Sequence, residues 1–227
     1  METKETLVFN KYELMDNLSS RELLIDLKNN TYTDENGIGF TSLRMEDHVI
    51  EANLIIRTPT SIKVYNPTVG TFSSNIVFLF DEIEIFIDTK LHLIYTTASA
   101  TKFNKAKTLF MNSIRTKVIF INLDFTPINI LNIIKLIDPK AYISDLTIKN
   151  FQYKKGAYGR YTVHVEDSSI GKELLNIYKD SVSKITLIVE SSTFSDFTLT
   201  TCVQNAFAIK SQESDFWFIV NLLKEYI

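Results

Sequence analysis

Hydrophobic residues in this chain change their spacing near residue 100, from every second residue to every third or fourth. Apolar and polar side chains alternate between Val49 and Arg57, as in a strand with one buried face. Between Thr101 and Arg115 the apolar side chains recur at helical spacing, with Phe103 and Ala106 on one face. The change predicts an α+β fold, a mainly antiparallel sheet with amphipathic helices packed on one face.

Other segments extend this pattern along the chain. Strands are predicted over residues 62–65, 76–80, 83–88 and 91–97, with Thr89 and Lys90 as a tight turn between the last two. In the second half, strands are predicted over 142–153, 158–165, 185–189, 197–203 and 207–210. Ser19 and Glu22 form a capping-box pattern that opens a short helix, and Pro127 precedes a helix over 128–137. Two further helices are predicted over 169–179 and 214–227.

The order of strand, hairpin and helix occurs twice. Displacing the chain by 113 residues aligns Phe103 with Phe216 and Ala106 with Ile219. Two interpretations stay open, a duplicated α+β unit or a chance match between two amphipathic helices. We divide the chain into an acidic N-terminal segment with a short helix (1–45), a first α+β half (46–140) and a second half (141–227). One continuous domain is the alternative to this division.

The composition narrows the class of protein. With 227 residues, of which 45% are hydrophobic, the chain can bury a substantial core. Cys202 is the single cysteine, which excludes an internal disulfide and a cysteine-based zinc cluster. The polar N-terminus resembles no signal peptide, and no run of about 18 apolar residues occurs. These features predict a cytoplasmic protein with no membrane contact.

Charge is unevenly distributed along the chain. Residues 1–88 contain 7 basic and 15 acidic residues, and residues 166–227 contain 5 basic and 9 acidic residues. Residues 89–165 contain 12 basic and 3 acidic residues, and acids are absent from 89–123 and from 146–165. Clustered Lys and Arg are what a polyanion-binding surface needs. The alternatives are a basic region neutralised by the acidic flanks and an ordinary solvated helix face.

The segment from Lys149 to Tyr161 interleaves four basic residues with four aromatic ones around a predicted hairpin turn. Cations neutralise phosphates and aromatic rings stack on bases, so this composition suits single-stranded nucleic acid. The alternative is a plain hairpin, in which Phe151, Tyr153 and Tyr161 pack on the sheet, and we favour it for the aromatic residues. The candidate nucleic-acid-binding residues are Lys149, Lys154, Lys155, Arg160 and Tyr158, with Lys102, Lys105 and Lys107 of the predicted helix as a second set.

One pattern suggests catalysis. Asp88 and Lys90 match the acid-x-Lys element of restriction-type nucleases, in which the acid binds a metal ion. However, the preceding acid of that element should lie on a separate strand at a longer separation, and Asp81 is too close; Lys90 also falls in a predicted turn. The solvent face of a hairpin explains these residues better, so we assign no catalytic or metal-binding residue and expect no cofactor.

Three hypotheses follow from the sequence. The first is a non-catalytic subunit that binds DNA or RNA through its basic middle region. The second is a protein-interaction or scaffold subunit without nucleic-acid contact, and the third is a metal-dependent nuclease around Asp88. The bias towards Ile, Asn, Lys, Phe and Tyr is typical of an AT-rich genome. We therefore expect a subunit of a larger prokaryotic or phage assembly, with a partner protein or a second copy of itself.

Overall fold

The protein is described by a computed structural model that covers residues 1–227 except 124, 139, 192–193 and 203–204. The described part contains five helices and eleven strands, and the strands form a mainly antiparallel sheet, which confirms the α+β class. The strands are β1 (Glu2–Leu14), β2 (Ile38–Glu46), β3 (Val49–Asn66), β4 (Thr71–Asp88), β5 (Leu93–Thr96), β6 (Val118–Ile121), β7 (Tyr142–Lys154), β8 (Ala157–His164), β9 (Val182–Val189), β10 (Phe197–Thr201) and β11 (Ala206–Gln212). The helices are α1 (Ser20–Lys28), α2 (Ala100–Ser113), α3 (Pro127–Ile137), α4 (Ser168–Ile177) and α5 (Phe216–Lys224).

The chain forms two compact units. Unit 1 comprises residues 1–11 and 121–227, and unit 2 comprises residues 12–120. Strand β1 contributes to both, because its first part pairs with β11 in unit 1 and its last residues belong to unit 2. The domain boundaries expected from the sequence stay a prediction.

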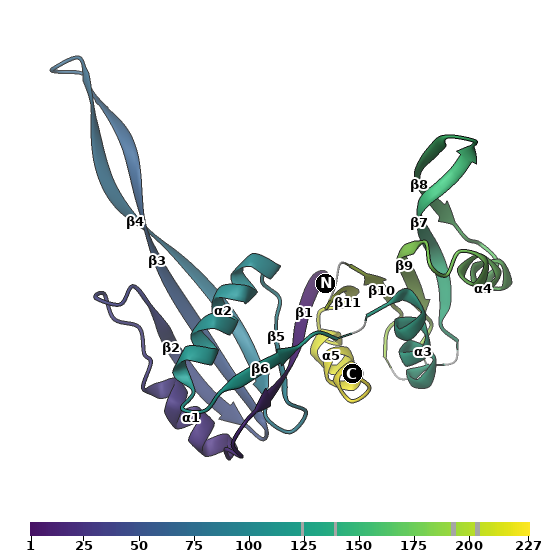
Figure 1. The fold of residues 1–227 in the computed structure, drawn as a ribbon, viewed down its shortest axis with the longest axis horizontal. Coiled ribbons are helices and arrows are strands. Elements are labelled where there is room, and N and C mark those ends of the chain that lie inside the picture. Colours follow the sequence, from purple (N-terminus) through teal and green to yellow (C-terminus); the bar gives the residue numbers. More distant parts are fainter. Residues whose placement is uncertain (124, 139, 192–193, 203–204) are drawn as a thin grey trace. The chain divides into compact units, whose positions relative to one another are not determined.

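Unit 2 is a sheet with two helices on one face. Its strands follow the order β2-β3-β4-β5, and Figure 1 shows α1 and α2 on the same side of them. The alternating residues of β3 and β4 bury one face, including Ile50, Leu54 and Ile85. The predicted capping box opens α1, because the Ser19 side chain accepts from the Glu22 N–H and the Glu22 carboxylate accepts from the Ser19 N–H.

The strands β3 and β4 are each 18 residues long and form one hairpin. The sequence predicts shorter strands here, interrupted around Pro59 and between residues 80 and 83. Proline is tolerated because β2 pairs with β3 only as far as Ile56, so beyond that point β3 is an edge strand. The turn between β4 and β5 also differs from the prediction: it spans residues 89–92 instead of two residues, and His92 has a φ of 53°.

Unit 1 contains the strands β1, β11, β10, β9, β7 and β8 in that order. Helix α3 contacts β9, α4 contacts β7 and α5 contacts β11. Three rings meet in its core: Phe9 stacks on Phe207 at 5.1 Å between centroids, and the half-buried Phe125 meets Phe207 edge-on at 5.3 Å. Both Phe9 and Phe207 are fully buried.

The residues aligned by the 113-residue displacement have similar environments. Phe103 and Phe216 are both buried, and so are Ala106 and Ile219. Both helices also follow an antiparallel strand pair, β4–β5 before α2 and β10–β11 before α5. Burial of these positions fits a duplicated unit and a chance match between two amphipathic helices alike, so both interpretations stay open.

No helix in the ranges that the structure describes is both long enough and apolar enough to span a membrane.

Candidate nucleic-acid interface

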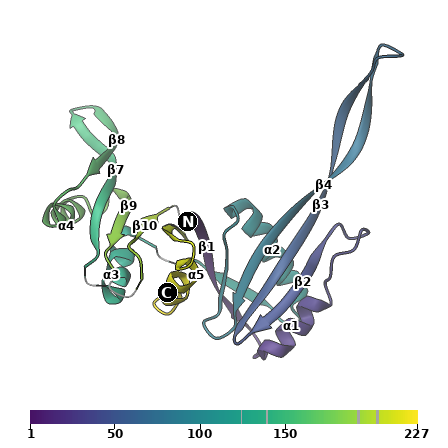
Figure 2. The ribbon, with the colours of Figure 1, turned by 180° about the vertical axis from the view of Figure 1, so that it is seen from behind.

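The basic, aromatic segment of the sequence forms the β7–β8 hairpin, which extends from the sheet of unit 1 (Figures 1 and 2). The two strands are joined at Lys155 and Gly156, and Gly156 has a φ of 81°, a conformation that glycine adopts without strain. A register shift lies between the pairs Ile148–Tyr161 and Phe151–Gly159, and Asn150 within it has a φ of 56°. Such a bulge bends and twists the outer part of the hairpin.

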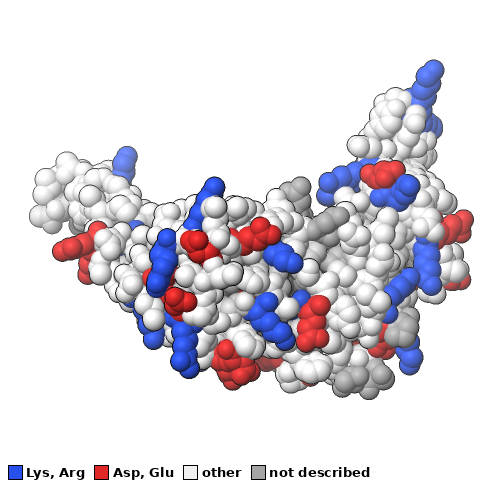
Figure 3. Space-filling model, turned by 60° about the horizontal axis from the view of Figure 1, so that its bottom comes forward, with Lys and Arg blue, Asp and Glu red and all other residues white. Residues whose placement is uncertain are grey.

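The predicted cations of this segment are exposed. Lys149, Lys154, Lys155 and Arg160 all lie at the solvent-accessible end of the hairpin, and none forms an ion pair with an acid in the described ranges. Figure 3 shows basic side chains gathered on this projection, at the upper right of that view. With no acid between residues 146 and 165, the end of the hairpin carries uncompensated positive charge.

The aromatic residues of the hairpin divide into two groups. Phe151 and Tyr161 stack on each other at 5.0 Å between centroids, and Phe151 also approaches Tyr178 at 6.1 Å. Tyr153 and Tyr158 are 76% and 66% exposed. The expectation that the aromatics pack on the sheet therefore fails for Tyr153, and the Lys154 ammonium lies 5.6 Å from the centroid of its ring.

Strand alternation places Tyr158 and Arg160 on one face of β8 and Tyr161 on the other. The face that carries Tyr161 continues inward to the core through Ile148 and Leu146, which are buried. The face that carries Tyr158 and Arg160 is polar towards its base, where the Thr147 and Thr162 hydroxyls lie 3.2 Å apart. Tyr158 and Arg160 can therefore contact one ligand together.

The second predicted set, on α2, lies in unit 2 and is less available. The Lys102 ammonium pairs with the Asp81 carboxylate at 2.7 Å, and this hydrogen bond, with the charge of Lys105, lowers the pKa of Asp81. The Lys107 ammonium lies 5.2 Å and 5.3 Å from the ring centroids of Phe103 and Phe120, and burial lowers its pKa. Of the three, Lys105 is exposed, whereas Lys102 and Lys107 are half-buried.

Asp88, the centre of the nuclease hypothesis, is buried and stabilises a turn. Its carboxylate accepts hydrogen bonds from the backbone N–H groups of Lys90 at 3.1 Å and Leu91 at 2.9 Å. Asp81 is engaged by Lys102. Within the described residues, no group of three His, Cys, Asp or Glu side chains is arranged to hold a metal ion.

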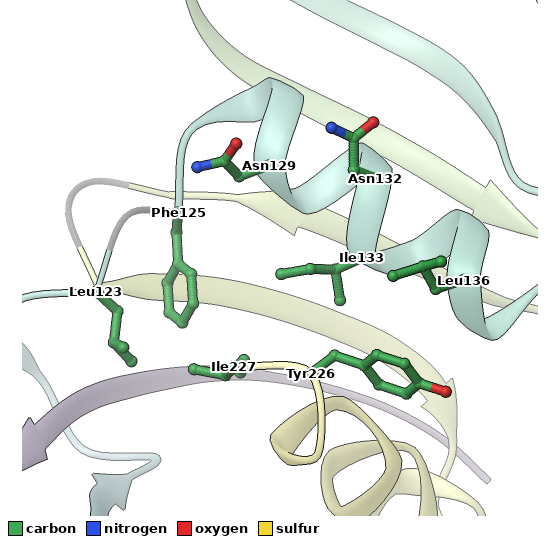
Figure 4. Close-up of a pocket in the computed structure, with 8 residues that line it drawn as sticks. All are labelled: Leu123, Phe125, Asn129, Asn132, Ile133, Leu136, Tyr226 and Ile227. Atoms are coloured by element: carbon green, nitrogen blue, oxygen red, sulfur yellow. The ribbon is translucent and has the colours of Figure 1, made fainter.

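One open pocket of about 360 Å³ lies in unit 1, between α3 and the residues after α5 (Figure 4). Figure 4 shows Phe125 and Ile133 directed into it, with Ile227 opposite. Its polar side chains are those of Asn129, Asn132 and Tyr226. The remaining lining is apolar, so the pocket suits an apolar group.

The sequence did not predict that the outer part of the β3–β4 hairpin is an exposed apolar surface. This part exposes Phe72, Ile76 and Phe80 by more than half. Two features of the sequence could have indicated this surface. A turn, Asn66-Pro67-Thr68-Val69-Gly70, joins two alternating segments, and Lys63 is the one charged residue between Thr58 and Phe80.

Comparison with known proteins adds no relative: no protein-family model matches the chain, and none of the curated proteins is similar to it in sequence.

Proposed function

We propose that this protein is a non-catalytic nucleic-acid-binding subunit that contacts single-stranded DNA or RNA through the β7–β8 hairpin. The observation that carries the proposal is the combination of four exposed cations, which form no ion pair in the described ranges, with the exposed rings of Tyr153 and Tyr158 at one acid-free end of the hairpin. The cations can neutralise successive phosphates, and the tyrosine rings can stack on unpaired bases. On this proposal the protein works in the cytoplasm, within a larger prokaryotic or phage assembly.

Exposed rings favour single strands over duplexes. In a duplex the base faces are stacked on one another, whereas a single strand presents them to a protein. The Lys102, Lys105 and Lys107 set contributes little to the proposed site, because Lys102 is paired with Asp81 and Lys107 packs on two rings.

The first prediction concerns the cations. Replacing Lys154, Lys155 and Arg160 with Ala together should weaken binding of a single-stranded oligonucleotide about 100-fold near 0.1 M salt, since each lost phosphate contact removes about 0.7 of a released counterion. Fluorescence anisotropy of a labelled oligonucleotide, with and without Mg²⁺, measures this loss. The wild-type affinity should also fall steeply with added salt.

A matched control removes the same charge elsewhere in unit 1. Lys4 and Lys11 on β1, which three strands separate from β7 in the sheet, and Lys140, before the end of β7 opposite the turn, are exposed. Their triple Ala variant should keep the wild-type affinity within roughly threefold, because screening weakens distant charges. Equal weakening in the two variants, or no binding of DNA or RNA by the wild type, would contradict the proposal. Cleavage of the oligonucleotide with Mg²⁺ that is lost in Asp88→Ala would instead support the nuclease hypothesis.

The second prediction concerns stacking. Tyr158→Ala should weaken single-strand binding about tenfold, since one base stacked on an aromatic ring contributes roughly 1–3 kcal/mol. The affinity for a duplex of the same length should change little. Tyr226→Ala, which removes a partly exposed tyrosine outside the hairpin, is the control. Equal losses on single and double strands would show that Tyr158 does not stack on bases.

A further inference from the structure

The outer half of the β3–β4 hairpin, which we call the arm (residues 58–80), extends beyond the rest of unit 2 in both ribbon views (Figures 1 and 2). Pairing with β2 ends at Ile56, and pairing with β5 begins only at Phe86. Among the residues that the structure describes, β3 and β4 in the arm therefore pair with each other alone, and each leaves one edge of backbone N–H and C=O groups open. A two-stranded ribbon of this kind is marginally stable alone in water.

The arm is apolar and almost uncharged. Its exposed apolar side chains are 40–70% accessible: Ile62, Val64, Tyr65, Val69, Phe72, Ile76, Phe78, Leu79 and Phe80. Lys63 is its single charged residue. Figure 3 shows the end of this projection, at the far left, covered almost entirely by uncharged residues. A contiguous apolar surface of this extent usually marks an interaction site.

The two open edges differ in how well their residues prevent pairing with a further strand. The β3 edge contains Pro59, which has no N–H to donate, and Lys63, two devices that discourage further strand pairing. The β4 edge from Thr71 to Phe80 contains no proline, glycine or charge. We propose that this β4 edge pairs antiparallel with the same edge of a second copy of the chain, so that the two arms form one four-stranded sheet.

The sequence of the edge suits a two-fold axis. Side chains at even positions of β4 lie on one face, and Phe72 and Phe80 are each four residues from Ile76. An axis at Ile76 places Ile76 against its own copy and Phe72 against Phe80 of the second copy. Aromatic and aliphatic pairs opposite each other across strands stabilise a sheet.

The lack of charge and the apolar character of the edge both favour a second copy as the occupant. A nearly neutral surface gives no electrostatic attraction to a charged partner, and it meets its own copy without like-charge repulsion. The exposed side chains of β4 in the arm present roughly 500 Å² of apolar surface, given about 200 Å² for a whole aromatic side chain. Pairing of the two edges shields the part of this surface where side chains of the two β4 strands lie beside each other. Interfaces between identical subunits are also the more apolar ones.

The test is the oligomeric state of the full chain, by light scattering after size exclusion at increasing concentration. The wild type should reach twice its 26.1 kDa monomer mass. Ile76→Lys should remain a monomer, because it sets two ammonium groups opposite each other at the axis. Ile62→Lys, the same change on β3 away from the pairing edge, should still dimerise. Both residues are exposed, so both variants should keep the wild-type circular dichroism spectrum.

A disulfide gives an independent measure of the geometry. In a Cys202→Ser background, Ile76→Cys should form a covalent dimer on mild oxidation, since directly opposed residues place their Cβ atoms about 5 Å apart. Ile62→Cys should not. A wild-type monomer at about 100 µM, open aggregates in place of a dimer, or equal loss of dimer in Ile62→Lys would overturn the proposal.

Discussion

Replacing Phe207 with Ala is expected to destabilise unit 1 by about 3–5 kcal/mol, the usual cost of truncating a buried phenylalanine. Phe207 is fully buried and touches the rings of both Phe9 and Phe125. The substitution removes the ring at the centre of this trio, and the neighbouring side chains can fill only part of the cavity. The ratio of folded to unfolded molecules should fall by roughly 100-fold or more, since 1.4 kcal/mol corresponds to a factor of ten in an equilibrium constant.

Urea denaturation followed by circular dichroism measures this change. Phe218→Ala, the same change at a side chain that is 53% exposed, is the control and should cost less than about 1 kcal/mol. If both variants lose the same stability, the aromatic trio is not the centre of the core of unit 1.

Gly39→Ala is expected to lower the free energy of unfolding of unit 2 by about 3 kcal/mol, the upper end of the usual range for a methyl group added to a packed site. A Cβ atom at this position would lie 2.4 Å from the backbone nitrogen of Tyr32 and 2.6 Å from the carbonyl carbon of Thr31. The chain after α1 crosses β2 here, and the Tyr32 N–H donates to the Phe40 carbonyl at 2.9 Å. Backbone atoms cannot rotate away as a side chain can, so this hydrogen bond must break or lengthen.

Gly159→Ala provides the matched control. It is the same substitution in a strand, with no atom within 4 Å of the added Cβ, so it should leave stability unchanged or raise it slightly. The midpoint of thermal unfolding should therefore fall for Gly39→Ala alone. Equal midpoints in the two variants would mean that the backbone crossing at Gly39 relaxes at little cost.

Local signals in the sequence predicted much of the secondary structure. The Ser19–Glu22 capping box marks the beginning of α1, and Pro127 is the first residue of α3, because both residues act on the backbone within one turn of the helix. Alternation predicted β3 and β4, but not their full length. Proline in a strand is normally a stop signal, and the sequence does not reveal that β3 is an edge strand at Pro59.

The candidate site was also predictable only in part. The β7–β8 hairpin concentrates its cations within a short segment of sequence, so their grouping was predictable. The contacts of the α2 cations were not predictable. Asp81, which pairs with Lys102, lies on β4, and Phe120, which packs against Lys107, lies on β6. Such contacts depend on tertiary packing, and neither composition nor periodicity encodes them.

Strand β1 also constrains the order in which the chain can fold during synthesis. Glu2 pairs with Gln212 and Val8 pairs with Ala206, so β1 can pair with β11 only after about 200 further residues have been synthesised. Unit 2 is continuous in sequence and can fold while the ribosome is still translating unit 1. Until β11 emerges, one edge of β1 stays unpaired, and a nascent chain arrested before residue 206 should expose that edge to chaperones.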